Sequence, residues 1–245
     1  MNSATSNGRR VGIIQSNYIP WKGYFDFIAC CDDFVILDQV QYTRRDWRNR
    51  NLIKTSSGLA WLTVPVTVKG KYDQAINETM ISNSGWADEH TRTLWHTYKR
   101  ADGFDTVWPL VEDLFGKVRQ HELLTHVNEV LLRGIASYLG IDTPIHRSEQ
   151  FGSAEGKNER LINICRQLGA TEYLSGPAAK SYIDESLWNA AGIQVRYKSY
   201  AGYPEYQQLH PPFEHGVSIV DLLFCTGKDA CKYIGSAAAL EPALA

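Results

Sequence analysis

The sequence predicts an α/β fold, with a mostly parallel, Rossmann-like sheet and a central helical segment. Both ends of the chain alternate short apolar runs with helical stretches, while the middle carries apolar residues at helical spacing. The 245 residues, 44% of them hydrophobic, suffice for one large core. We expect a disordered start over residues 1–10, a single domain over 11–235 with a helical insertion at about 84–140, and a flexible tail over 236–245.

The first predicted unit is strand, loop, short helix, strand. Residues 11–15 and 34–37 are short apolar runs, and the helix lies within residues 21–31. This connection is long enough for a right-handed crossover between parallel strands. Residues 60–66 form a third strand candidate, and Pro65 places it at a sheet edge or a strand end.

The central third of the chain is predicted to be mainly helical. Residues 86–101 and 123–139 repeat apolar side chains at helical spacing. Ser84 is the expected N-cap of the first helix, and Gly140 is expected to end the last one.

After Pro144 the chain returns to alternating elements. Gly169 and Gly192 mark two helix-to-strand turns. The elements expected there are a helix at 158–168, a strand at 171–175, a helix at 185–191 and a strand at 193–197.

Charge and composition exclude several classes of protein. The chain has a net charge of −2, but residues 1–54 carry +3 and the remainder −5, which favours one local anionic ligand over duplex nucleic acid. The five cysteines form no C-x-x-C pair and no cluster with histidine, so neither a zinc site nor a disulfide framework is indicated. No apolar stretch is long enough to span a membrane, and we expect a cytoplasmic protein with reduced thiols.

A run of cationic side chains after the second strand predicts an anion site. Arginine suits bidentate contact with phosphate or carboxylate. The alternative is a surface loop whose arginines pair with acids elsewhere. The cations are Arg44, Arg45, Arg48, Arg50 and Lys54, and Gln41, Tyr42, Trp47, Asn49 and Asn51 lie among them.

The loop after the first strand is a second candidate for ligand binding. Gln15, Asn17, Tyr18 and Trp21 follow the carboxyl end of a probable parallel strand, where ligands of open α/β sheets bind. Gly23 allows close backbone approach near the helix start. The aromatic residues of this loop form a packed corner in the alternative interpretation.

Two residues are candidates for acid–base chemistry. His90 is the candidate base, with a surface helix histidine as the alternative. Asp38 ends the second strand, and the nearby arginines are expected to lower its pKa, so that a structural ion pair is the alternative to a catalytic role.

Cys225 is a candidate nucleophile, for which the alternative is an inert buried thiol. The chain has neither a G-x-S-x-G elbow nor a P-loop.

Several stretches together resemble the WbqC-like proteins. They are residues 14–26, IQSNYIPWKGYFD; 37–42, LDQVQY; 45–54, RDWRNRNLIK; and 63–66, 168–171, 173–176 and 218–224, together with His90 and Tyr98. The resemblance implies a part in bacterial O-antigen or related surface-polysaccharide synthesis, where a glycine-transferring role has been suggested. Ser175 and Gly176 join the expected substrate-binding residues. Ser16 and Gln39 stand where the family more usually has Pro and Asp, so a second carboxylate beside Asp38 is absent.

The leading functional hypothesis is transfer of an acyl or aminoacyl group to the amine of a nucleotide-linked amino sugar. The arginines and Lys54 would hold the pyrophosphate, His90 or Asp38 would deprotonate the amine, and Gln15, Asn17 and Asn49 would position the acyl carbonyl. The donor is a thioester, a carrier protein or an aminoacyl-tRNA, and no metal is expected. The alternatives are an ATP-dependent ligase or nucleotidyl-transferring enzyme and a non-catalytic sugar-nucleotide-binding module.

Overall fold

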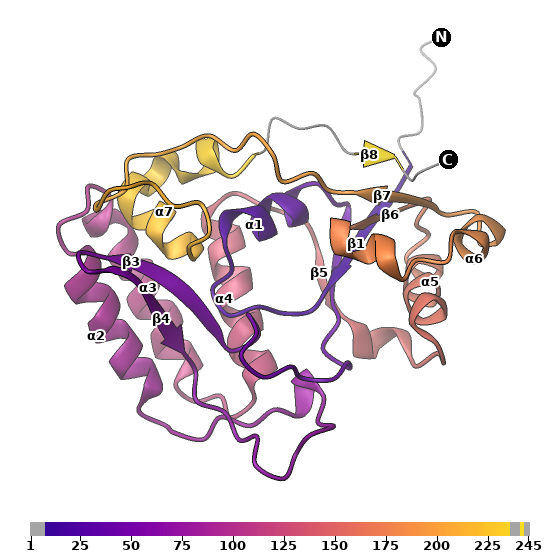
Figure 1. The fold of residues 1–245 in the computed structure, drawn as a ribbon, viewed down its shortest axis with the longest axis horizontal. Coiled ribbons are helices and arrows are strands. Elements are labelled where there is room, and N and C mark those ends of the chain that lie inside the picture. Colours follow the sequence, from indigo (N-terminus) through magenta and orange to yellow (C-terminus); the bar gives the residue numbers. More distant parts are fainter. Residues whose placement is uncertain (1–7, 236–240, 243–245) are drawn as a thin grey trace.

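The computed structural model describes residues 8–235 and 241–242, and over these ranges the protein has the predicted α/β fold (Figure 1). The main sheet has the strand order β5-β2-β1-β6-β7-β8. Its first five strands are parallel and β8 is antiparallel to β7. The strands are β1 (Arg10–Ile14), β2 (Asp33–Ile36), β5 (Ile145–Arg147), β6 (Glu172–Ser175), β7 (Gln194–Tyr197) and β8 (Glu241–Pro242).

Helices cover both faces of this sheet. On one face, Val11, Ile13 and Val35 pack with α5 (Lys157–Gln167) and α6 (Glu185–Ala190). On the other face, Phe34 and Ile36 pack with α1 (Lys22–Ala29). This alternation follows from the two-residue period of a strand and produces two apolar clusters that share β1 and β2.

A helical layer extends the core on the α1 side. It consists of α2 (Trp86–Tyr98), α3 (Phe104–Val118), α4 (Leu124–Tyr138) and α7 (Ile219–Thr226), and an antiparallel hairpin of β3 (Arg50–Thr55) and β4 (Gly58–Thr63) packs against it. Figure 1 shows these helices and the hairpin on the left and the sheet with α5 and α6 on the right. Within the described residues, no helix combines the length and the apolar character needed to cross a bilayer.

Three local expectations differ from the structure. The predicted strand at 60–66 is β4, which ends at Thr63 and belongs to the separate hairpin. Ser84 is not the N-cap of α2, because Gly85 occupies that position without a side-chain cap. Arg9 and Arg10, placed in the disordered start, form ion pairs with Asp33 and Glu172, and β1 begins at Arg10.

The two ends of the chain lie partly outside the described residues. Residues 1–7 of the expected disordered start, and 236–240 and 243–245 of the expected tail, are among those that the structure does not describe. Glu241–Pro242 pair with β7 as β8.

A long connection without helix or strand, residues 198–218, runs from the end of β7 past α1 to α7 (Figure 1); we call it the strap. Lys198 Nζ lies 2.7 Å from Asp26 Oδ2 on α1, and Tyr203 Oη donates to the same oxygen over 2.6 Å. Lys22 Nζ donates to Pro204 O over 2.7 Å. These buried contacts fix the strap against α1.

Candidate functional site

The candidate site lies at the point where the chain changes direction across the sheet. From β1 the chain continues through α1 to β2 on one side, whereas from β6 it continues through α6 to β7 on the other. The carboxyl ends of the adjacent parallel strands β1 and β6 are therefore followed by loops that diverge. Ligands of open α/β sheets bind in the crevice at such a switch point.

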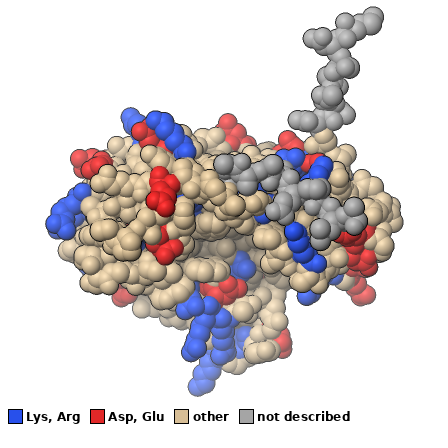
Figure 2. Space-filling view, turned by 45° about the horizontal axis from the view of Figure 1, so that its top comes forward, with Lys and Arg blue, Asp and Glu red and all other residues tan. Residues whose placement is uncertain are grey.

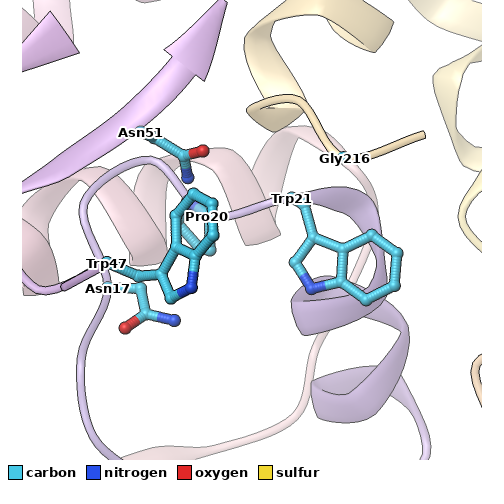
Figure 3. Close-up of a pocket in the computed structure, with 6 residues that line it drawn as sticks. All are labelled: Asn17, Pro20, Trp21, Trp47, Asn51 and Gly216. Atoms are coloured by element: carbon cyan, nitrogen blue, oxygen red, sulfur yellow. The ribbon is translucent and has the colours of Figure 1, made fainter. Parts of the chain in front are cut away.

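A pocket of about 290 Å³ opens beside the loop that follows β1 (Figure 3). Its lining residues are Asn17, Pro20, Trp21, Trp47, Asn51 and Gly216. Figure 3 shows the indole rings of Trp21 and Trp47 on either side of a gap. We call this the indole pocket. The structure brings together Asn17, Trp21 and Trp47, which are predicted to bind the substrate, with Asn51 of the predicted cationic run, and it adds Pro20 and Gly216.

Arg48 holds the shape of the loop after β1. Its Nη1 donates to Ser16 O over 3.2 Å, to Gln15 O over 3.4 Å and to Asn17 Oδ1. Its Nη2 lies 3.7 Å from Asp46 Oδ2. The guanidinium is therefore occupied by groups of the protein itself.

Asn17 presents the donor of the pocket. Its Oδ1 accepts from Arg48, while its Nδ2 has no hydrogen-bond partner among the described residues and lies on the pocket side in Figure 3. Asn51 is satisfied internally, because its Nδ2 donates to Tyr18 O and Ile19 O and its Oδ1 accepts from Leu52 N. Asn51 thus fixes the wall, and Asn17 offers an amide N–H to a ligand.

Three further residues of the predicted anion site serve the fold in this arrangement. Lys54 is buried, and its Nζ donates to Gln208 Oε1 over 2.9 Å. Arg50 stacks 4.0 Å from the Trp61 ring and donates to Arg45 O. Asn49 donates to the Val64 carbonyl and accepts from the Tyr42 hydroxyl. Arg45 is exposed to solvent, and it adopts a positive φ of 58°.

Asp38 lies at the centre of a buried polar network behind the pocket. Its carboxylate accepts from Ser16 N, Ser16 Oγ and Thr125 Oγ1 over 2.6 to 2.8 Å. Asn128 Nδ2 donates to Ser16 Oγ and to Arg48 O, so the network joins the chain after β2, helix α4 and the pocket loop. Burial raises the pKa of Asp38, although these hydrogen bonds and Arg48 oppose the rise. The prediction of a lowered pKa is wrong, because desolvation outweighs the arginine.

His90 is buried behind the same loop. Its Nδ1 lies 2.7 Å from Tyr18 Oη, and its ring packs edge-on against Trp86. A hydrogen bond between the Thr63 backbone and the ring opposes the effect of burial on the pKa of His90. Burial lowers the pKa of His90 to about 4, so it is neutral at pH 7. In this geometry it positions Tyr18, and its role as a base stays a prediction.

The loop after β6 contributes Gly176 to the other side of the switch point. A Cβ added to Gly176 would lie 3.9 Å from Tyr200 Oη, and the Tyr200 ring packs 5.3 Å from that of Trp21. Gly176 is thus next to the aromatic wall of the strap, while Ser175 is buried and donates to Tyr173 Oη over 3.2 Å.

Three other candidate residues, Gln15, Gln41 and Cys225, do not present their side chains to the indole pocket. Gln15 contributes its backbone oxygen, which accepts from Tyr24 Oη and Arg48, and Gln41 lines another cavity. Burial raises the pKa of Cys225 to about 12, so it is a thiol at neutral pH. Within the described residues, no three His, Cys, Asp or Glu side chains are grouped to hold a metal ion.

Comparison with known proteins places this chain in a family. The model of the WbqC-like protein family matches residues 15–233. A protein of Mycobacterium tuberculosis, named "Uncharacterized protein Rv1507c", is 49% identical over 226 residues, which cover 92% of this chain and 97% of that protein. No solved structure matches. Because the family match covers most of the chain, the protein belongs to the WbqC-like protein family.

Proposed function

We propose that the protein binds a nucleotide-linked amino sugar in the indole pocket and transfers an acyl or aminoacyl group to its amine. The supporting observation is that the indoles of Trp21 and Trp47 line one pocket, on either side of a gap, beside the Asn17 amide N–H in the loop after β1. Indole faces stack on nucleobases and on the apolar faces of sugars. Membership of the WbqC-like family hints at a role related to polysaccharide biosynthesis.

The proposed reaction forms a C–N bond between the amine and the acyl carbon. The bond from that carbon to the thiol or hydroxyl of the donor breaks, and the amine loses a proton that balances the one taken up by the leaving group. Asn17 Nδ2 is the group we assign to the acyl oxygen, on which negative charge develops. Asp38 and His90 act in this proposal through Ser16 and Tyr18, which flank Asn17.

A second candidate function is sugar-nucleotide binding without turnover. The observation that favours it is that none of the six residues lining the indole pocket has a titratable side chain. Catalysis at this site must therefore come from positioning and from hydrogen-bond donors.

Trp47→Ala tests the ligand site. Because stacking contributes about 1–3 kcal/mol per base, the dissociation constant of a uridine-diphosphate amino sugar should rise about tenfold in calorimetric titration. Trp47 is 42% exposed, so the melting temperature should hardly change. Trp95→Ala is the matched control, since Trp95 is 37% exposed and lies on α2.

Equal affinity in the Trp47→Ala protein and the unaltered protein would refute the placement of the ligand.

The reaction is tested by mass spectrometry of the sugar nucleotide after incubation with acyl-coenzyme A or glycyl-tRNA. An amide product supports the transferase, and binding without product supports the binding module.

A further inference from the structure

A second cavity, of about 280 Å³, lies at the other end of the segment that carries Trp47. Its lining residues are Gln41, Tyr42, Thr43, Arg44, Lys71 and Tyr72. They come from the chain after β2 and from the connection after β4. This cavity shares no lining residue with the indole pocket, so it is a distinct place for a ligand or for part of one.

The cavity gathers exposed cations. Arg44 and Lys71 line it, Arg45 and Lys69 are their near neighbours in sequence, and all four are exposed. None of the four forms an ion pair with a carboxylate of the described residues. Figure 2 shows Lys and Arg side chains projecting together from the lower edge of the molecule, where the chain between β4 and α2 lies in Figure 1.

Hydrogen bonds hold the walls of the cavity in place. Both the backbone and the side chains of residues 41–44 bond to residues 67–75, so the connection forms a fixed wall. The bonds between the two segments are Arg44 Nη2 to Val68 O (2.6 Å), Gln41 Nε2 to Tyr72 O (3.1 Å) and Tyr42 N to Gln74 O (2.9 Å). Within residues 67–75, Gln74 Nε2 also donates to Thr67 O over 2.9 Å.

We infer that this cavity binds the phosphate groups of a phosphorylated ligand. Arg44 gives one N–H to Val68 and keeps others for phosphate oxygens, while Lys71 supplies a point charge. Tyr72 is 77% exposed on the fixed wall and offers a ring face to a base or ribose. The inference deepens the proposed function, on which it rests for the source of the phosphate: the nucleotide of the acceptor or a coenzyme-type donor.

The test is calorimetric titration with pyrophosphate at low ionic strength. Removing both cations, in the double variant Arg44→Gln and Lys71→Gln, should raise the dissociation constant at least tenfold, because each cation donates charge-assisted hydrogen bonds to phosphate oxygens. A double variant of two exposed cations of α2 and its C-cap, Arg92→Gln and Lys99→Gln, has the same charge change and should keep the affinity.

Equal affinity in the Arg44/Lys71 variant and the unaltered protein would overturn the inference, as would the absence of pyrophosphate binding to the unaltered protein. If loss of the Arg44 bond to Val68 unfolds the double variant, Lys71→Gln with Tyr72→Ala is measured instead, because neither side chain donates a hydrogen bond to the protein.

Two further ligands identify the source of the phosphate. If uridine diphosphate binds more tightly than pyrophosphate and this binding requires Arg44 and Lys71, the cavity holds the phosphates of the acceptor. If coenzyme A binds more tightly than pyrophosphate and requires the same two residues, the cavity holds the phosphates of the donor. Trp47→Ala should leave pyrophosphate binding unchanged while weakening the amino-sugar nucleotide. Failure of the indole pocket and failure of this cavity are therefore separate results.

Discussion

At the residue scale, charged side chains near the site are used mainly to shape it. Arg48 bonds to three oxygens of the pocket loop, and Asp38 accepts the backbone and hydroxyl protons of Ser16 in the same loop. Buried charges of this kind are retained only when their hydrogen bonds are satisfied, so they impose a defined geometry on the groups around them. The exposed groups that remain are Asn17 Nδ2 and the two indole rings.

The lowered pKa of His90 predicts how the stability of the protein depends on pH. The folded-state pKa of about 4 lies below the usual value of 6.5, so the stabilisation is fully present above pH 6.5 and is lost as the pH falls toward 4. The difference between these two pKa values corresponds to about 3 kcal/mol. In urea unfolding between pH 7 and pH 4, the unaltered protein should therefore lose about 3 kcal/mol more than His90→Gln.

The control for this prediction is His96→Gln, an exposed histidine of the same helix, which should follow the unaltered protein. The raised pKa values of Asp38 and Asp221 act with the opposite sign, because their stabilisation is lost as the pH rises. They are common to all three proteins and cancel in the comparison. Parallel pH profiles for the unaltered protein and His90→Gln would contradict the assignment.

At the element scale, a buried ion pair is one of the contacts that hold the strap against α1. Lys198 and Asp26 are 3% and 8% exposed, and their charged atoms are 2.7 Å apart. Lys198→Met leaves the carboxylate of Asp26 without this partner, so the free energy of unfolding should fall by about 3–5 kcal/mol in urea titration. Lys117→Met removes an exposed pair with Asp113 and should leave the midpoint unchanged. Equal midpoints for the two variants would show that the pair does not hold the strap.

The elements of the parallel sheet could be predicted because their local signals agree with the fold. Strands at β1, β2, β6 and β7 are short apolar runs, and Gly169 and Gly192 adopt φ values of 67° and 71° at the predicted turns. The element α3 contains Pro109, which masks a helical pattern. The strand β3 contains the cationic residues Arg50 and Lys54, so its sequence is more typical of a binding loop than of a strand.

The site could be predicted only in part, because partners distant in sequence decide what each residue does. Asn17, Trp21 and Trp47 were identifiable from their place after strands, and they do line the pocket. Lys54 is a residue type that commonly binds anions. In the structure, however, its Nζ donates to Gln208, which lies 154 positions later in the sequence. Gly216 reaches the pocket through the strap, and nothing in its local sequence indicates this.

At the scale of the whole molecule, the two apolar clusters share the same strands. Val11 and Ile13 belong to one cluster and Phe34 and Ile36 to the other, although β1 and β2 are neighbours in register. Opening the sheet removes one wall from each cluster, so neither can stay folded alone.

We therefore expect a single unfolding transition despite the length of the chain. With 5-fluorotryptophan incorporated, the resonances of Trp86 in one cluster and Trp188 in the other should disappear at the same urea concentration. Trp86→Phe and Trp188→Phe assign the two signals. Separate midpoints would show that the two faces unfold independently.

The indole pocket joins segments that leave the ribosome far apart in time. Trp21 and Trp47 are synthesised early, whereas Gly216 and the strap residues packed on Trp21 come near the end of translation, and β1 pairs with β6 only after residue 172 exists. A nascent chain lacking its last third has both indoles but lacks Gly216, the strap residues packed on Trp21, and β6. The pocket proposed for the ligand is therefore completed only when synthesis is almost finished, and we expect unfinished chains to bind the proposed ligand more weakly than the full chain.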